Sequence, residues 1–447
     1  MGLNVAIPKD YVEWAAKLFD PTRIHEKPEA LRGIRVLDLS VIYFGPATAD
    51  FLGELGAEVI KVEMPGQGDV TRILGNASFF WKNVSVAFFC ANHSKFHVGV
   101  DMHKPEGQEL IRQLAARSDI VIENFKAGTL EEKFGIGYRQ LREVNPRLIY
   151  VANTGFGQWG PFSRGCASYD GLAQAVSGLT AITGEGETPT KIGNYLGDWF
   201  GASMSALAAL RWRDRSDEGQ FVEMAQCEGL VRAMDWTWLY AGLTGRDRAK
   251  VGNGDHVFSP SGVYRCADGW IALVAGTDRE FLALCRLIGE PALAREARFA
   301  SRESRRERGN ARALDEALGA WCAGKTRARI ERAARKAGVA AAPVMTAADH
   351  AKSDQLRARR TLWEHDDPVY GPMVETGPAP KLSATPARIK WAGKPVGFHN
   401  DFVFKRILGL DDTKIRELEA AGAVGQWAED QRGAARPDGW RGEGRFS

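Results

Sequence analysis

The sequence has little net charge and no long apolar run. Its 59 Lys and Arg residues nearly balance its 56 Asp and Glu residues, and the basic residues are scattered along 447 positions. A net charge of +3 is too small to indicate that the protein binds nucleic acid. No stretch of about 18 apolar residues is present, which excludes an ordinary transmembrane helix, and the N-terminus lacks the apolar core of a secretion signal. We therefore expect a cytoplasmic protein that binds neither nucleic acid nor membranes.

Cofactor and metal motifs are also missing. The six cysteines form no C-x-x-C pair, so neither a zinc site nor a disulfide framework is indicated, and we expect reduced thiols and no bound metal. No G-x-G-x-x-G follows the first predicted strand, so a nicotinamide or flavin cofactor is not expected. The cysteines lie at Cys90, Cys166, Cys227, Cys266, Cys285 and Cys322.

What the sequence does contain is an alternation of short apolar strands and helices. A strand at 35–40, a helix at 47–56 and a strand at 57–63 form a strand–helix–strand unit. The pattern continues with strands at 96–101, 119–123 and 146–154 and a helix at 105–117. This alternation predicts an α/β fold with a doubly wound, Rossmann-like parallel sheet. Ligands of such sheets gather at the carboxyl ends of the strands, which here carry Tyr43, Glu63, Asn124 and Phe125.

The composition changes beyond residue 215, which predicts two domains. Residues 1–224 form the first part of the large Rossmann-like domain, 225–345 a smaller α+β domain, and 346–427 the return to the large one. In the smaller domain, the Trp-rich segment 225–240 is predicted as one helix. The final residues, 428–447, are rich in Gly and Arg and nearly free of apolar residues, which predicts disorder.

One acid stands out in the segment 191–210. Asp198 follows a glycine and precedes the small, apolar run 199–210, which has the composition of a buried helix. An acid at the start of a helix meets the free first-turn N–H groups and the positive end of the macrodipole. Asp198 is therefore either a simple N-cap or an ionised carboxylate held ready for chemistry.

The chain resembles the class III CoA-transferases over residues 31–422. The formyl-CoA:oxalate and carnitine CoA-transferases belong to this family. The resemblance begins with Leu31–Ser40, Gly45-Pro46, Leu55–Glu63 and Gly68–Arg72, and continues through Asn92–Lys95, Glu123–Phe125, Gly155–Gly157, Gly197-Asp198, Gly397–His399 and Leu408–Leu418.

The resemblance implies that Asp198 is the nucleophile, acylated during CoA transfer. It also implies that CoA, a thioester substrate and not a permanent cofactor, lies against Ile42, Val100, Asn124 and Phe125, with Lys133 near its phosphates. The family's glycine-rich covering loop matches Gly252 and Gly254. Enzymes of this type are interlocked dimers, so a homodimer or a heteromer with a homologous subunit is expected.

Three questions stay open at the level of sequence. The same fold hosts α-methylacyl-CoA racemases, but Tyr169 stands where those enzymes carry a catalytic His, and a tyrosine of pKa about 10 is a poor base at neutral pH. A partner subunit of a heteromeric transferase is a further alternative. Tyr43 and the aromatic segments 79–81, 88–89 and 236–238 line either an acyl pocket or a core. A pocket would suit a phenyl-bearing acid, as in benzylsuccinate CoA-transferases with succinyl-CoA as donor.

Overall fold

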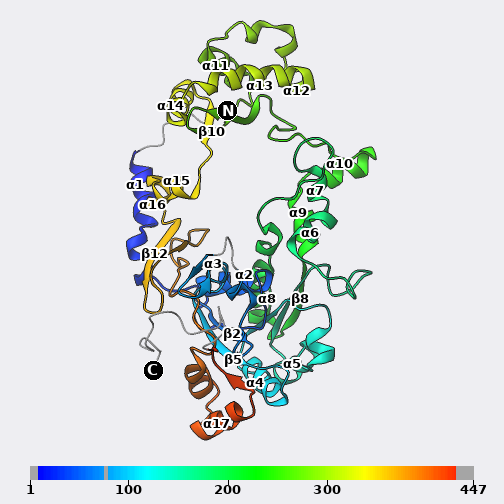
Figure 1. Ribbon diagram of the computed structural model, residues 1–447, viewed down its shortest axis with the longest axis vertical. Coiled ribbons are helices and arrows are strands. Elements are labelled where there is room, and N and C mark those ends of the chain that lie inside the picture. The colour runs from blue at the N-terminus through cyan, green and yellow to red at the C-terminus, as the bar shows by residue number, and fades with distance from the viewer. Residues whose placement is uncertain (1–8, 75–78, 429–447) are drawn as a thin grey trace. The chain divides into compact units, whose positions relative to one another are not determined.

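The computed structural model describes residues 9–74 and 79–428, which form two compact units (Figure 1). Among the described residues, the larger unit holds 12–74, 79–179, 191–236 and 355–428. The smaller unit holds 9–11, 180–190 and 237–354. The tail from 429 to 447, predicted to be disordered, lies outside the described residues. Among the helices described, none has the length and apolar character needed to span a bilayer.

The larger unit contains a seven-stranded sheet in the order β14-β5-β2-β1-β6-β7-β8. The six strands from β5 to β8 run parallel, and β14 pairs antiparallel with β5. Counted along the chain, the parallel strands lie in the order 3-2-1-4-5-6, which reverses between β1 and β6. The predicted α/β fold with a large parallel sheet is confirmed. The strands are β1 (Arg35–Asp38), β2 (Glu58–Glu63), β5 (Lys95–Val100), β6 (Ile120–Glu123), β7 (Ile149–Thr154), β8 (Gln220–Ala225) and β14 (Val424–Gly425).

Helices cover both faces of this sheet (Figure 1). On one face, α2 (Phe44–Glu54) and α8 (Ser203–Ser216) contribute to a core cluster. On the other, α4 (Pro105–Ala115), α5 (Tyr138–Val144) and α17 (Asp412–Ala420) do the same. A sheet buried on both sides needs continuous apolar strands, and Ile120, Val121 and Ile122 are fully buried accordingly.

Shorter elements complete the larger unit. The helix predicted over 225–240 is two helices, because Asp235 takes a positive φ of 45° between them. The chain passes between the two units within α1 (Lys9–Leu18), α7 (Leu179–Ile182) and α16 (Asp354–Ala358), and again at residues 190–191 and 236–237. The shorter elements of the larger unit are α3 (Val86–Phe89), α6 (Asp170–Ser177), α9 (Gln226–Ala233), β3 (Phe80–Trp81), β4 (Val84–Ser85), β12 (Leu362–Asp367) and β13 (Gly371–Thr376).

The smaller unit packs helices against an antiparallel sheet in the order β11-β10-β9. Its core cluster joins Ile271 and Leu273 of the central strand to Leu318 and Ile330 of two helices. The elements are β9 (Ser261–Cys266), β10 (Gly269–Val274), β11 (Ala340–Pro343), α10 (Thr237–Thr244), α11 (Asp278–Ile288), α12 (Arg302–Arg306), α13 (Arg308–Ala323), α14 (Arg327–Ala337) and α15 (Ala347–Ala351).

Candidate functional site

Three cavities of the larger unit follow one another around the carboxyl ends of the parallel strands. Cavity A has a volume of about 270 Å³, cavity B about 200 Å³ and cavity C about 220 Å³. Val41 lines A and C, Phe125 lines A and B, and Ile42 and Asn124 line B and C. The loops after β1 and β6 thus form a shared wall, at the point where the strand order reverses.

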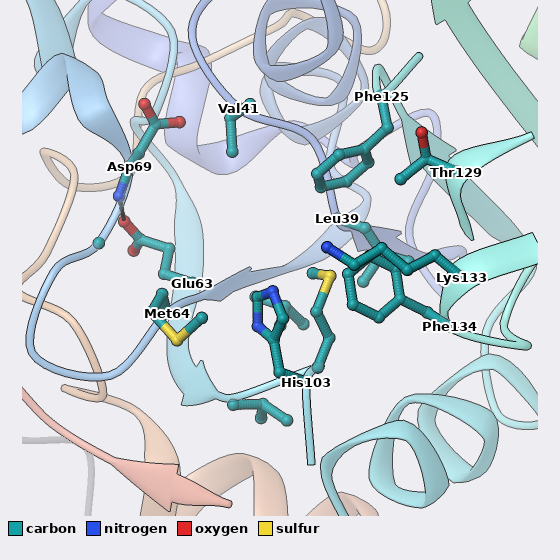
Figure 2. A pocket seen from close by; sticks show the side chains of 14 residues that line it. Leu39, Val41, Glu63, Met64, Asp69, His103, Phe125, Thr129, Lys133 and Phe134 are labelled. Atoms are coloured by element: carbon teal, nitrogen blue, oxygen red, sulfur yellow. Dashed lines mark hydrogen bonds between the residues drawn. The ribbon is translucent and has the colours of Figure 1, made fainter. Parts of the chain in front are cut away.

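Cavity A is an apolar pocket that a lysine amine enters (Figure 2). Phe125 and Phe134 lie on one side of it and Met64 on the other. The Lys133 Nζ lies 4.9 Å from the centroid of the Phe134 ring, and His103 lines the same space. Such a pocket suits a flat apolar group that carries an anionic substituent.

Buried ion pairs fix the strand ends beside cavity A. The Arg72 guanidinium donates two hydrogen bonds of 2.8 Å to Glu63, and Lys95 Nζ donates one of 2.9 Å to Asp38. Burial opposes ionisation of Glu63, but Arg72 and His97 hold the pKa of its carboxyl well below the usual value. Against the same opposition, neighbouring lysines lower the pKa of Asp38. Both acids are therefore permanently charged parts of the scaffold.

The loop between β1 and α2 is strained and held on two sides. Ile42 has a φ of 68°, a conformation that β-branched residues rarely adopt. Its N–H donates to the Asp69 carboxylate at 3.1 and 3.2 Å. The Asn124 side chain accepts from the Val41 N–H at 2.8 Å and donates to the Val41 carbonyl at 2.6 Å. These contacts fix the backbone that presents Tyr43 to cavity C.

Asp198 lies in cavity C among aromatic and neutral polar groups. It belongs to the short helical turn Leu196–Trp199 and is 7% exposed. Gln226, the first residue of α9, donates a hydrogen bond of 2.6 Å from Nε2 to Asp198 Oδ1. The rings of Tyr43 and Tyr195 stack at 5.5 Å and line the same cavity. Among the described residues that line cavity C there is no Lys or Arg, so the carboxylate faces no cation there.

This environment raises the pKa of Asp198 to about 7. Burial is the main cause, the Asp170 carboxylate adds to it, and the Gln226 hydrogen bond opposes it. Asp170 is fixed in turn, because it accepts from the Gly197 N–H at 2.7 Å and from Gln174 Nε2 at 2.5 Å. A Cβ on Gly197 would lie 2.9 Å from Asp170 Oδ1, so this close approach needs glycine. A carboxyl of pKa about 7 is reactive at neutral pH as acid, base or nucleophile.

The structure corrects the predicted relation between Asp198 and the next helix. That helix, α8, begins at Ser203 and not at 199, so Asp198 is not in its first turn. Gly201 separates the two elements, because its backbone packs onto α2 where a Cβ would lie 2.0 Å from Thr48 Oγ1. The prediction that a helix N-terminus keeps Asp198 ionised is therefore wrong, since burial dominates. The helix is also not buried all round, because Met204 is exposed.

Most of the predicted site residues come together at the three cavities. Tyr169, which is 68% exposed, precedes α6 and lines cavities B and C. Gly252 and Gly254 belong to the smaller unit, where the Gly252 N–H donates to the Gly184 carbonyl at 3.0 Å, and their role as a cover stays a prediction. Cavity A is lined by Val100, Phe125 and Lys133, and cavity C by Ile42, Tyr43, Asn124, Tyr169 and Asp198.

Several lining residues were not found from the sequence, among them Gln226, Tyr195 and Val41. Gln226 follows directly after β8, so the rule that ligands gather at strand ends would have pointed to it. Tyr195 lies close to Asp198 in sequence, but its contact with Tyr43 joins segments that are distant in the chain. Val41 carries no chemical signal and is placed only by the fold.

The model of the family described as CoA-transferase family III matches residues 31–400. Succinyl-CoA–D-citramalate CoA-transferase of Chloroflexus aurantiacus is 35% identical over 398 residues, which are 88% of this chain and 98% of the relative. The beta subunit of succinyl-CoA–L-malate CoA-transferase from the same bacterium is 33% identical over 399 residues, which are 87% of this chain and 97% of the relative. A crystal structure of a CAIB/BAIF family protein from Brucella suis superposes with a TM-score of 0.77 at 30% identity, covering 85% of this chain and 100% of that chain.

Proposed function

The chain belongs to CoA-transferase family III, and from this premise we propose that it transfers CoA from succinyl-CoA to a second small dicarboxylic acid, with Asp198 as the acyl carrier. The observation that carries the proposal is Asp198 itself. It is a nearly buried carboxyl of pKa about 7 that accepts a hydrogen bond from the neutral Gln226 amide, in a cavity that shares lining residues with cavities A and B.

Each step of the proposed reaction exchanges one acyl bond for another. The Asp198 carboxylate attacks the thioester carbonyl, the C–S bond breaks, and a mixed anhydride and CoA thiolate form. The thiolate attacks the Asp198 acyl carbon, the anhydride C–O bond breaks, and the donor acid leaves an enzyme-bound CoA thioester. The acceptor carboxylate then attacks this thioester to give a new anhydride and thiolate. Attack of the thiolate on the acceptor acyl carbon yields the new acyl-CoA and restores Asp198.

The environment of Asp198 suits a carboxylate that must attack and then leave. A carboxylate of raised pKa is more basic and hence more nucleophilic than an exposed one. Gln226 donates to the oxygen of the ionised form, and the same amide is placed to stabilise negative charge that develops on the adduct. The anhydride and the thioester both hydrolyse, so the burial of Asp198 also limits contact with water.

We place CoA along the series of cavities. Its adenine fits cavity A between Phe125 and Met64, where Lys133 offers positive charge to the phosphates. The pantetheine arm then passes Ile42 and Asn124 to bring the thioester to cavity C. The Asn124 side chain holds the Val41 backbone, because its amide oxygen accepts from the Val41 N–H and its amide nitrogen donates to the Val41 carbonyl, so its part is to shape this wall.

The acceptor class rests on the relatives and on the size of the pocket. The two relatives act, by their names, on succinyl-CoA with citramalate or malate, which are small dicarboxylic acids. We infer that cavity C, of about 220 Å³, accommodates an acid of that size beside Tyr43, Tyr169 and Tyr195. These rings also leave an acceptor with a phenyl group, such as benzylsuccinate, as a candidate to be tested beside the smaller acids.

The first experiment traps the intermediate. The enzyme is mixed with succinyl-CoA in the absence of acceptor, treated with hydroxylamine or borohydride, digested and examined by mass spectrometry. We expect a modified peptide at Asp198, which is absent from Asp198→Asn. Asp170→Asn is the matched control, because it removes the neighbouring carboxyl and should still be modified at Asp198. Turnover without any adduct at this position, or an adduct elsewhere, would remove Asp198 as the carrier.

The second experiment identifies the acceptor. The enzyme is incubated with succinyl-CoA and, one at a time, citramalate, malate, glutarate, mesaconate and benzylsuccinate, and the acyl-CoA products are separated by mass. We expect the highest kcat/KM for one of the small acids. Exchange of the α-hydrogen for deuterium without CoA transfer would instead identify a racemase.

We also propose that the active enzyme contains two chains. Several apolar side chains on α6 and α8 are exposed in the single chain, namely Leu172, Val176, Met204 and Trp212, and we interpret them as residues that a second chain covers. One relative is a subunit of a heteromeric enzyme by its name. Sedimentation of the purified chain, together with its assay alone, decides between a homodimer and a heteromer, because a heteromeric subunit stays inactive until its partner is added.

A further inference from the structure

Three side chains of the metal-ligand type meet inside the larger unit, away from the cavities. Asp50 and Glu54 lie one turn apart on α2, and His93 lies on the segment after α3. His93 Nε2 is 3.0 Å from Asp50 Oδ2 and 3.1 Å from Glu54 Oε1. One ligand atom from each residue lies within 4.8 Å of the other two, and within the described residues this cluster has no second example.

A second observation concerns the unsatisfied oxygen of Asp50. This residue is 2% exposed, and its Oδ1 has no hydrogen-bond partner, while Oδ2 faces His93. Buried carboxylate oxygens in native proteins are almost always hydrogen-bonded or bound to an ion, so an unpartnered one requires an explanation.

Two carboxyl groups and one imidazole thus meet in the interior of the larger unit. The nearby lysines Lys95 and Lys381 make their hydrogen bonds to other groups.

We propose that Asp50, Glu54 and His93 form a structural binding site for one divalent transition-metal ion, best suited to Zn²⁺. One imidazole nitrogen and two carboxylate oxygens are a ligand set that Zn²⁺ accepts, with a fourth position left for Asp50 Oδ1 or a water molecule. In a tetrahedral site with bonds of ~2.1 Å, neighbouring ligand atoms lie ~3.4 Å apart. The distances of 3.0 and 3.1 Å therefore need to open by only a few tenths of an ångström.

A bound metal ion would also balance the negative charge of the two carboxylates. His93 becomes a ligand by releasing its Nε2 proton to solvent, and the two carboxylates then balance the charge of the ion. The ion would tie α2, whose first residue Phe44 lines cavity C, to the segment 90–94. The cysteine spacing predicted no metal site. Cysteine spacing could not reveal this cluster, because the cluster contains no cysteine and joins a helix to a distant loop.

The test is metal binding by the whole purified protein. The protein is dialysed against EDTA, titrated with ZnCl₂ by calorimetry, and its metal content is measured by mass spectrometry. We expect one Zn²⁺ per chain, release of a proton on binding, and a higher melting temperature with Zn²⁺ than after EDTA. Loss of this metal is separable from loss of the proposed transfer chemistry, because Asp198 is acylated without it.

Matched variants locate the ion. Asp50→Asn and His93→Gln keep the shape of the side chains and should reduce the stoichiometry from one to zero, with folding checked by circular dichroism. His350→Gln removes an exposed histidine beside Asp349 in the smaller unit and should keep one Zn²⁺. Should a variant not fold, the wild-type protein loaded with Co²⁺ decides by its visible absorption. A four-coordinate spectrum supports the site; a six-coordinate spectrum, no uptake, or full uptake by both folded variants overturns it.

Discussion

Two groups of buried acids in the larger unit differ in what lies beside them. Glu63 and Asp38 each touch a cation, and the pKa of each is lowered although burial opposes this. Asp198 and Glu123 are buried as well, but they accept hydrogen bonds only from neutral groups, Gln226 and the Phe125 N–H. Burial raises the pKa of Asp198 to about 7 and that of Glu123 to about 8. The partner, and not burial alone, decides whether an acid is scaffold or reactive group.

The two groups have opposite effects on stability as the pH changes. The paired acid Glu63 has a lowered folded pKa, so its stabilisation is present above its unfolded pKa and is lost as the pH falls below it. Asp198 has a raised folded pKa, so the native state binds a proton between about pH 4 and pH 7 that the unfolded state has lost. Its ionisation therefore destabilises the fold as the pH rises through that range.

The largest effect should come from Asp198→Asn. We expect transfer to fall by at least about 10³-fold, because the carrier is removed. At pH 8 the free energy of unfolding should rise by up to about 4 kcal/mol, since no charge is then buried, and this gain should vanish near pH 4. Product analysis and urea unfolding at both pH values measure the two quantities. A loss of both activity and stability would show that Asp198 stabilises the fold as Glu63 and Asp38 do. The contrast between the two groups of acids would then be wrong.

Glu63→Gln should show the reverse pattern, in which the main effect is a loss of stability. The Arg72 guanidinium would remain buried without its partner, and we expect the free energy of unfolding at pH 8 to fall by about 3–5 kcal/mol. The double variant Glu63→Gln, Arg72→Met is the matched control, because it removes both charges and should recover much of the loss. Denaturant unfolding of the three proteins measures this, and a loss below about 1 kcal/mol for the single variant would contradict the scaffold role.

The parallel sheet could be predicted from the sequence because its strands are apolar on both faces and alternate with helices. Ile120, Val121 and Ile122 show this directly. The ends of elements were harder to predict. Gly201 follows the turn that holds Asp198 because the Thr48 side chain of α2, from another segment, leaves no room for a Cβ there. Such a contact between distant parts of the chain leaves no local pattern.

The site was predictable where chemistry and strand ends coincide. Asp198, Asn124 and Phe125 follow a family motif, and all of them line the cavities. The raised pKa of Asp198 was not predictable, because it depends on the depth of burial and on Asp170, which is brought close by its hydrogen bond to the Gly197 N–H. The stacking of Tyr43 on Tyr195 likewise depends on the folded backbone.

A smaller effect is expected when the neutral donor of Asp198 is removed. Gln226→Met keeps the volume of the side chain but leaves the ionised Asp198 without its hydrogen bond, so the pKa of Asp198 should rise further. We expect kcat/KM at pH 7 to fall by about tenfold, since a hydrogen bond to a charged group is lost, and to recover partly at higher pH. The pH profile of kcat/KM measures this. A uniform loss at every pH would show that Gln226 acts on substrate binding instead.

The smallest and most diagnostic effect should come from Asp170→Asn. Removal of this like charge lowers the pKa of Asp198, so more of the reactive carboxylate is present on the acidic side of the profile. We expect kcat/KM at pH 6 to rise by up to several-fold, within the tenfold that a unit of pKa allows, with little change at pH 8. Glu228→Gln, which removes an exposed acid from α9, is the matched control and should leave the profile in place. A profile that does not move in Asp170→Asn would mean that burial alone sets the pKa of Asp198, whereas a move toward higher pH would show that the Asp170 hydrogen bond to Gly197 matters more than its charge.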